Sequence, residues 1–401
     1  VEANSAPAAG HRDPAPVKMT NVRETPSAEA RFSRPRFRYI VGAAVLAGVI
    51  VVPVAWVRVA PRTHSSSASA SETWVGSTTA PIPQEVRVLT GYHGGPVTDD
   101  EGHSWTPDAY YAGGISKAIP PEHFIEAEAH PHLLKAQRSG QFRYDIPLQP
   151  GNYELHLYFA ETEYGRGNLG GGGEGTRMFQ VSINGLLRLR ELDPLAEAGA
   201  PNRMHERVFK DIAPASDGKL HLSFDPANAP AFLNAIEILP SPPGRIRPVR
   251  IVAQANALTD SQGHAWAADG YFCGGTPVFR QNFVISPPEK ALYRGERYGN
   301  FSYHIPLAPG KYRLSLHFAE QWFGTAESGL PLRGSRIFNV FANGVTLLRN
   351  FQIVEDAGGP NRGVTKVFNN LEPNAQGMLL LDFVPVKNYA EVNAIEVVEN
   401  E

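Results

Sequence analysis

The stretch IPLQPGNYELHLYFAE, residues 146–161, occurs a second time as IPLAPGKYRLSLHFAE, residues 305–320. The offset between the two is 305 − 146 = 159 residues. Upstream, DDEGHSWTPDAYYAGG (99–114) is matched in the same order by DSQGHAWAADGYFCGG (260–275). Ordered matches of this kind indicate two tandem copies of one structural module.

Within each copy the apolar residues of the repeated stretch recur at every second position. Tyr153, Leu155, Leu157 and Phe159 are separated by more polar residues, and residues 312–318 repeat the pattern. A period of two predicts strands that bury one face. The 38 glycines and 34 prolines favour short strands joined by turns over long helices. We therefore expect an all-β chain with two antiparallel β-sandwiches of the jelly-roll type. Four side chains of each copy should lie in its core: Leu155, Phe159, Leu222 and Phe224, and Leu314, Phe318, Leu381 and Phe383.

The N-terminal part of the chain has a different composition. The uncharged run from Tyr39 to Val57 is long enough to cross a bilayer as one helix. Arginines are denser before this run than after it, which places the N-terminus in the cytoplasm and the sandwiches outside. The alternative is a cleaved signal peptide with its processing site near Ala68-Ser69-Ala70. The expected organisation is a disordered segment at 1–38, a membrane helix at 39–57, a flexible linker at 58–84, and domains at 85–240 and 248–401.

Charge and cysteine content exclude several classes of function. The formal net charge of −3 provides no field that would attract nucleic acid. Cys273 is the single cysteine, so neither an intramolecular disulfide nor a cysteine-based zinc site can form. We expect no cofactor and no metal ligated by histidine. Two pairs of acids match between the copies, namely Asp99 with Asp260 and Glu161 with Glu320. These acids could orient loops, bind sugar hydroxyls or hold a structural calcium ion.

Four short motifs occur in order in both copies: FAE followed by an aromatic residue, R-x-F-x-V-x-x-N-G, AG-x-PNR and NAIE. Together they resemble the malectin domain, a carbohydrate-binding β-sandwich related to the galactose-binding-like jelly rolls. The resemblance covers Val86 to about Leu239 and Val249 to about Val398. It implies a noncatalytic module that binds glucose disaccharides through loop aromatics and an aspartate.

The resemblance also implies which residues contact sugar. In the second copy they are Trp266, Tyr271, Phe272, Glu320, Trp322, Phe323, Asn361 and Asn388. In the first copy they are Trp105, Tyr110, Tyr111, Glu161, Tyr164 and Asn202.

The two copies differ in their candidate sugar-binding residues. The first copy has Glu163 where the second has Trp322, and Ala229 where the second has Asn388. We therefore expect the second copy to bind more tightly. Adjacent strand residues point to opposite faces, so one of Trp322 and Phe323 should be exposed.

The favoured function is noncatalytic binding of a neutral di- or oligosaccharide by a single-pass protein of the cell membrane. Sugar sites need flat aromatic rings for stacking and amides or carboxylates for hydroxyl groups, and the loop residues supply both. The alternative for Trp105 and Trp266 is that they fill the ends of the sandwiches. For the chain as a whole, the alternatives are an accessory part of a glycoside hydrolase system, or spacer and protein-binding modules without sugar affinity. Residue types leave the sugar and the oligomeric state open.

Overall fold

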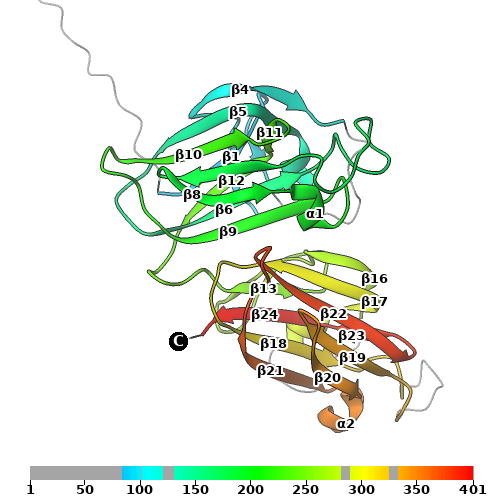
Figure 1. Cartoon of the computed structure of the whole chain (residues 1–401). Coiled ribbons are helices and arrows are strands. Elements are labelled where there is room, and N and C mark those ends of the chain that lie inside the picture. The colour runs from blue at the N-terminus through cyan, green and yellow to red at the C-terminus, as the bar shows by residue number, and fades with distance from the viewer. Residues whose placement is uncertain (1–83, 100, 121–130, 281–289, 325–332, 401) are drawn as a thin grey trace, which may run out of the picture. The chain divides into compact units, whose positions relative to one another are not determined.

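The computed structural model describes residues 84–99, 101–120, 131–280, 290–324 and 333–400. These residues form two sets of elements in the same order, joined by the segment from Ser241 to Pro248 (Figure 1). The first set is β1 (Val86–Leu89), β2 (Val97–Thr98), β3 (Ser104–Trp105), β4 (Tyr111–Ala118), η2 (Pro131–Leu134), β5 (Ala136–Pro147), β6 (Tyr153–Ala160), β7 (Phe179–Ile183), β8 (Leu186–Leu192), α1 (Pro194–Ala198), β9 (Met204–Ile212), β10 (Lys219–Pro226), β11 (Ala231–Leu233) and β12 (Ala235–Pro240).

The second set repeats the first, element for element. It is β13 (Val249–Val252), β14 (Leu258–Thr259), β15 (Ala265–Trp266), β16 (Phe272–Phe279), η3 (Lys290–Tyr293), β17 (Gly295–Pro306), β18 (Tyr312–Ala319), β19 (Ile337–Ala342), β20 (Val345–Phe351), α2 (Ile353–Ala357), β21 (Gly363–Leu371), β22 (Met378–Lys387), β23 (Ala390–Val392) and β24 (Ala394–Glu399). This correspondence is what the internal sequence repeat predicts.

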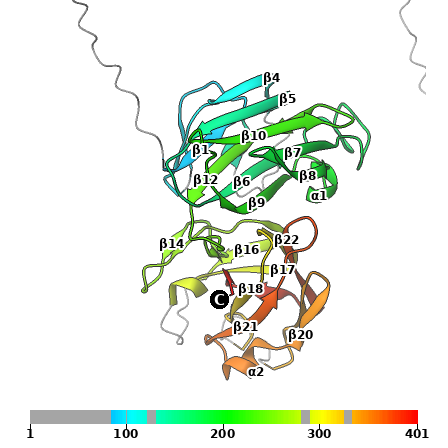
Figure 2. The same ribbon diagram turned by 60° about the vertical axis from the view of Figure 1, so that its left-hand side comes forward.

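Each set forms a four-stranded and a six-stranded sheet whose strands pair antiparallel. In the first sandwich the orders are β1-β12-β6-β9 and β11-β5-β10-β7-β8, with β4 also on β5. In the second they are β13-β24-β18-β21 and β16-β17-β22-β19-β20, with β23 also on β17. Figure 2 shows β16 beside β17, and β16 is the edge strand of their sheet. The expected all-β architecture is therefore confirmed.

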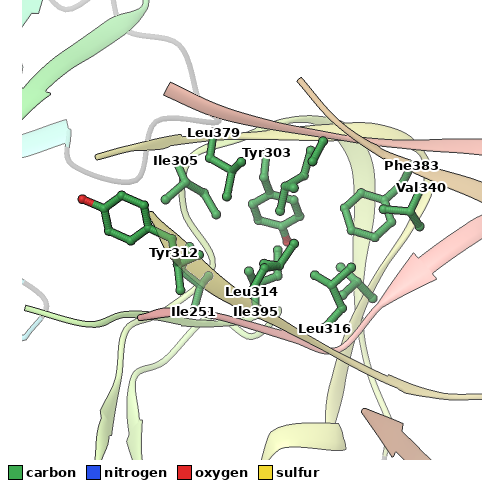
Figure 3. Close-up of a cluster of buried hydrophobic side chains, with 14 of the residues drawn as sticks. Ile251, Tyr303, Ile305, Tyr312, Leu314, Leu316, Val340, Leu379, Phe383 and Ile395 are labelled. Carbon is green, nitrogen blue, oxygen red and sulfur yellow. The ribbon is translucent and has the colours of Figure 1, made fainter. Parts of the chain in front are cut away.

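The core of each sandwich lies between its two sheets. The eight side chains expected there are all fully buried, from Leu155 in the first sandwich to Phe383 in the second. In the second, Leu314 and Leu316 of β18 face Tyr303 of β17 and Val340 of β19 (Figure 3). At roughly 1.5–3 kcal/mol for each large side chain, this burial is the main source of stability.

Two features differ from the sequence expectation. β6 is buried on both faces, because Trp105 packs edge-on against Tyr158 with ring centroids 6.1 Å apart. The short helices α1 and α2 were not predicted. Asp193 caps α1 by accepting hydrogen bonds from the backbone N–H groups of Leu195 and Ala196, and Gly199 ends it at φ 73°.

The expected membrane helix from Tyr39 to Val57 lies outside the described residues. Among the residues that are described, no helix has both the length and the apolar character needed to span a bilayer.

A buried asparagine marks the point where each chain copy passes from one sheet to the other. Asn393 stands between β23 of the six-stranded sheet and β24 of the four-stranded sheet. Its Oδ1 accepts from the backbone N–H of Ala319 at 2.6 Å, and its Nδ2 donates to the carbonyl of Gly295 at 2.8 Å. Asn234 makes the equivalent bonds in the first sandwich. One amide therefore ties β18 to β17 across the sandwich.

We expect Asn393→Ala to destabilise the second sandwich by about 2–4 kcal/mol, since each buried partner left unpaired costs about 1–3 kcal/mol. Chemical denaturation followed by tryptophan fluorescence measures the change. Asn300→Ala, an exposed asparagine of β17, is the matched control and should change the free energy of unfolding by less than about 0.5 kcal/mol. Equal effects of the two substitutions would contradict the role given to Asn393.

Candidate functional site

The loop after β18 is shaped by a buried carboxylate. Glu320 Oε1 accepts hydrogen bonds from the backbone N–H groups of Trp322 and Phe323, both at 3.0 Å. Its other oxygen accepts from Nε of Arg336 at 2.6 Å. Glu161 binds the N–H groups of Glu163 and Tyr164 in the same way. Both glutamates are buried, so they orient their loops and present no free carboxylate to a ligand.

The turn made by Glu320 separates the two adjacent aromatic rings. Trp322 is 37 % exposed, whereas Phe323 is 6 % exposed and lies 5.2 Å from the guanidinium of Arg336. The expectation that one of them faces solvent is confirmed. The guanidinium of Arg280 lies 5.3 Å from the centre of the Trp322 ring and donates to Glu296 at 2.6 Å. The indole is thus held by a cation whose own position is fixed by an ion pair.

A second exposed aromatic group stands close to this network. Tyr389 is 57 % exposed and contacts Tyr298 of β17, with ring centroids 5.7 Å apart. Its carbonyl accepts from Nη1 of Arg336 at 2.9 Å. Asn388, beside it, is exposed at φ 57° and donates its amide to the carbonyl of Ser335.

We call the set Trp322, Tyr298, Asn388 and Tyr389 the platform; Tyr298 is half-buried and the other three are exposed. Trp322 and Tyr389 are linked through Glu320 and Arg336, and Tyr298 contacts Tyr389. Tyr298 and Tyr389 were missed by the sequence analysis. The internal repeat contained the signal, because the first copy has Ser139 and Pro230 at these positions, so the aromatic pair occurs in the second copy alone.

Tyr271 and Phe272 lie apart from the platform. β16 pairs Phe272 with Tyr303 and Thr276 with Tyr298, so four residues, roughly 13 Å of strand, separate them. The guanidinium of Arg297 covers one face of Phe272 at 3.4 Å. In the first sandwich Arg138 covers Tyr111 at 3.3 Å, and both Tyr110 and Tyr111 are 42 % exposed.

Trp105 and Trp266 fill the sandwich ends, as the alternative interpretation had it. They are 3 % and 4 % exposed, and each indole N–H donates at 3.0 Å to an aspartate, Asp99 or Asp260. Burial alone would raise the pKa of Asp260, but the hydrogen bonds from Trp266 and the His264 backbone lower it to about 2.

Asn202 and Asn361 also have partners within the fold. Their backbone N–H groups donate to the carbonyls of Glu161 and Glu320 at 2.8 Å, and both lie at positive φ. The side chain of Asn202 exchanges hydrogen bonds with Asn168 at 3.1 and 3.2 Å. These asparagines connect the loop after FAE to the AG-x-PNR segment.

In the first sandwich, a charged network occupies the position of the platform. Glu163 accepts from Lys117 at 2.6 Å, from Arg177 at 2.5 Å and from Gln137 at 3.2 Å. Burial raises its pKa, but Lys117 and Arg177 more than offset this and leave it below the usual value. Tyr164 is partly buried, with the Arg177 guanidinium 4.7 Å from its ring. The carboxylate is engaged within the fold instead of facing a ligand.

The described residues include no cluster of three or more His, Cys, Asp or Glu side chains suited to a metal ion. The matching acids, for which calcium was one of three possible roles, bind backbone N–H, indole or guanidinium donors instead. Of those roles, the geometry favours the orientation of loops.

Comparison with known proteins identifies the module. A sequence model of the malectin domain matches residues 91–229 and 248–395. A probable LRR receptor-like serine/threonine-protein kinase of Arabidopsis thaliana is 36 % identical over 104 residues, which are 25 % of this chain and 10 % of that protein. Kinesin-like protein KIN-14Q of the same plant is 35 % identical over 99 residues, 23 % of this chain and 8 % of that protein. The chain thus spans a tenth or less of these relatives.

Solved structures that match the chain include the plant receptor-like kinase FER, with a TM-score of 0.41 and 18 % identity over 79 % of this chain and 96 % of that chain. The ANX1 ectodomain from Arabidopsis thaliana has a TM-score of 0.40 and 18 % identity, covering 80 % and 97 %. Another such chain belongs to a complex of the peptide RALF23 with FER and LLG2, with a TM-score of 0.40 and 16 % identity, covering 80 % and 96 %.

The depressed pKa of Asp260 predicts acid sensitivity of the second sandwich. The carboxylate stabilises the fold above its unfolded pKa of 3.8, and this contribution is lost as the pH falls through about 2. Asp260→Asn should therefore be less stable than wild type at pH 7, and the difference should shrink between pH 4 and pH 2. Urea unfolding across this range measures it. Asp382→Asn, on the outward side of β22, is the control, and a difference that is constant with pH would refute the assignment.

Proposed function

Because the chain belongs to the malectin domain family, we propose that its second sandwich binds a neutral di- or oligosaccharide without transforming it. A sugar presents an apolar C–H face and a rim of hydroxyl groups. Binding it in water requires an exposed flat ring and polar groups beside the ring. The platform offers these features in the part of the second sandwich where Glu320 and Arg336 link Trp322 to Tyr389.

The observation that carries the proposal is the exposure of Trp322 while Arg280 holds it. A ring fixed in advance loses little conformational entropy when a sugar stacks on it. The exposed Tyr389 provides a second ring, and the side-chain oxygen of Asn388 is available for a hydroxyl group while its amide nitrogen binds Ser335. Two exposed rings and an amide suit more than one sugar unit.

The first sandwich lacks these features. Glu163 occupies the position of Trp322, and its carboxylate is paired with Lys117 and Arg177. Ala229 occupies the position of Asn388 and has no side-chain amide. We propose that this sandwich binds sugar weakly and serves as a spacer or a protein-binding module. The saturated Glu163 network is the observation that favours this second role.

A noncatalytic role is supported by the burial of an acid pair in the second sandwich. Glu296 and Glu391 are both fully buried, so substrate and water cannot enter between them as a glycoside hydrolase requires. We further propose that the chain is displayed at the cell surface by the apolar segment from Tyr39 to Val57, with both sandwiches outside the membrane.

Isothermal titration calorimetry of the full chain with a panel of neutral oligosaccharides tests the proposed site. Trp322→Ala should weaken binding at least tenfold, equivalent to about 1.4 kcal/mol, because the stacking surface is lost. Trp322→Phe keeps a ring and should retain most of the affinity. Val345→Ala, at an exposed valine of β20, is the control. Unchanged affinity in Trp322→Ala would remove the platform as the site, and no binding across the panel would favour the spacer role for both sandwiches.

A further inference from the structure

Five charged side chains lie beneath the platform of the second sandwich. Glu320, Glu296 and Glu391 are buried to within 1 % exposure. Arg336 binds Glu320 at 2.6 Å and lies 3.4 Å from Glu391, while Arg280 binds Glu296 at 2.6 Å. Glu391 also interacts with Glu296, which joins the five groups into one cluster. They come from β17 and β23, from the residues directly after β16 and β18, and from the residue before β19.

The charges in this cluster do not balance if every acid is ionised. Three carboxylates face two guanidinium groups, which would leave one uncompensated negative charge in a buried site, and such a charge is costly. The carboxylate oxygens also lack hydrogen-bond donors. Oε2 of Glu296 and both oxygens of Glu391 are buried, and no described donor gives them a hydrogen bond. One proton between the two carboxyl groups would balance the charge and join two of these three oxygens in a hydrogen bond.

The environment of Glu391 favours its protonated form. Burial raises the pKa of Glu391 well above its usual value; Arg336 opposes this, whereas Glu296 and Glu320 add to it. Tyr298 lies opposite Glu391 on β17, and Arg297 turns away to bind Asp269. The charged groups that face Glu391 are therefore Arg336, Glu296 and Glu320.

The first sandwich provides an internal comparison. Gln137 and Phe232 occupy the positions of Glu296 and Glu391, so the buried acid pair is absent there. Its remaining charges, Glu161 and Glu163 against Arg177 and Lys117, balance without a proton. The unbalanced cluster occurs in the sandwich that carries the platform.

We propose that Glu296 and Glu391 share one proton, and that Glu391 is a positioning residue which keeps the platform in its binding arrangement while that proton is present. The inference rests on the proposed function of the platform. When the pH rises, the proton passes to water and two carboxylates remain next to each other. Arg280 and Arg336 then rearrange to neutralise them. Because Arg280 holds Trp322 and Arg336 holds the carbonyl of Tyr389, both rings shift.

The shared proton is tested first by stability, which does not depend on any sugar. A folded-state pKa above the unfolded value means that the stabilising effect is complete below about pH 4.5 and is lost as the pH rises through the folded pKa. Glu391→Gln mimics the protonated acid. Its gain in unfolding midpoint over the wild-type full chain should be absent at pH 4.5 and grow toward pH 8. A gain that does not change with pH would overturn the shared proton.

The link to the platform is tested by Trp322 fluorescence and by maltose binding to the full chain between pH 5 and pH 8. The contribution of Trp322 to the fluorescence is the part of the emission that is lost in Trp322→Phe. This contribution should change with pH in the wild type but stay constant in Glu391→Gln. Maltose affinity should fall about tenfold in the wild type, as expected for a linkage of one pKa unit, and remain flat in the variant.

Glu296→Gln removes the other member of the pair and should also reduce the pH dependence of the unfolding midpoint. This second variant keeps the test valid if Glu391→Gln folds poorly. A pH-independent Trp322 signal in the wild type would overturn the positioning role. If maltose fails to bind while the stability and fluorescence profiles behave as stated, the proposed sugar is wrong and the shared proton stands.

Discussion

The side-chain amide of Asn393, and of Asn234 in the first sandwich, is the contact on which the rest of each sandwich depends. At this residue the chain leaves the six-stranded sheet and enters the four-stranded one, with no loop between β23 and β24. An amide carries a donor and an acceptor at fixed spacing, so it can bond both sheets at once. Its acceptor holds the N–H of Ala319, the residue directly before Glu320. The base of the loop that displays Trp322 is therefore anchored by the same bond that joins the sheets.

From that anchor, the loop is shaped by a buried ion pair. Glu320 and Arg336 exchange a charge-assisted hydrogen bond while the carboxylate also binds two backbone N–H groups. A buried pair of this kind contributes little net stability, because its desolvation offsets its attraction. Its value here is geometric. It separates Trp322 from Phe323 and, through Arg336, holds the carbonyl of Tyr389.

Apart from the matched pair Glu161 and Glu320, the two sandwiches have their buried or paired carboxylates at different positions. The first places one in the loop, at Glu163, with a lysine of β4 as partner. The second places carboxylates in the sheet, at Glu296 and Glu391, which leaves the loop position free for an indole. Substitutions that share one network are not independent, so these differences are best understood as one coupled change. An exposed indole occurs in one copy, while both copies have the same fold.

The sequence by itself determined the repeat, the all-β class and the eight core residues, because side chains on a strand alternate with a period that can be read locally. It also determined that Trp322 or Phe323 must be exposed. It left open whether Trp105 and Trp266 are buried, because residue types alone do not show what covers an indole ring. It did not reveal that Tyr298 and Tyr389 meet, since these two residues are far apart in the chain. Whether an aromatic ring or a carboxylate faces a ligand or a neighbour depends on which strands are paired beside it. Only the tertiary structure decided this pairing of strands. The same pairing determines which charged groups surround Glu391.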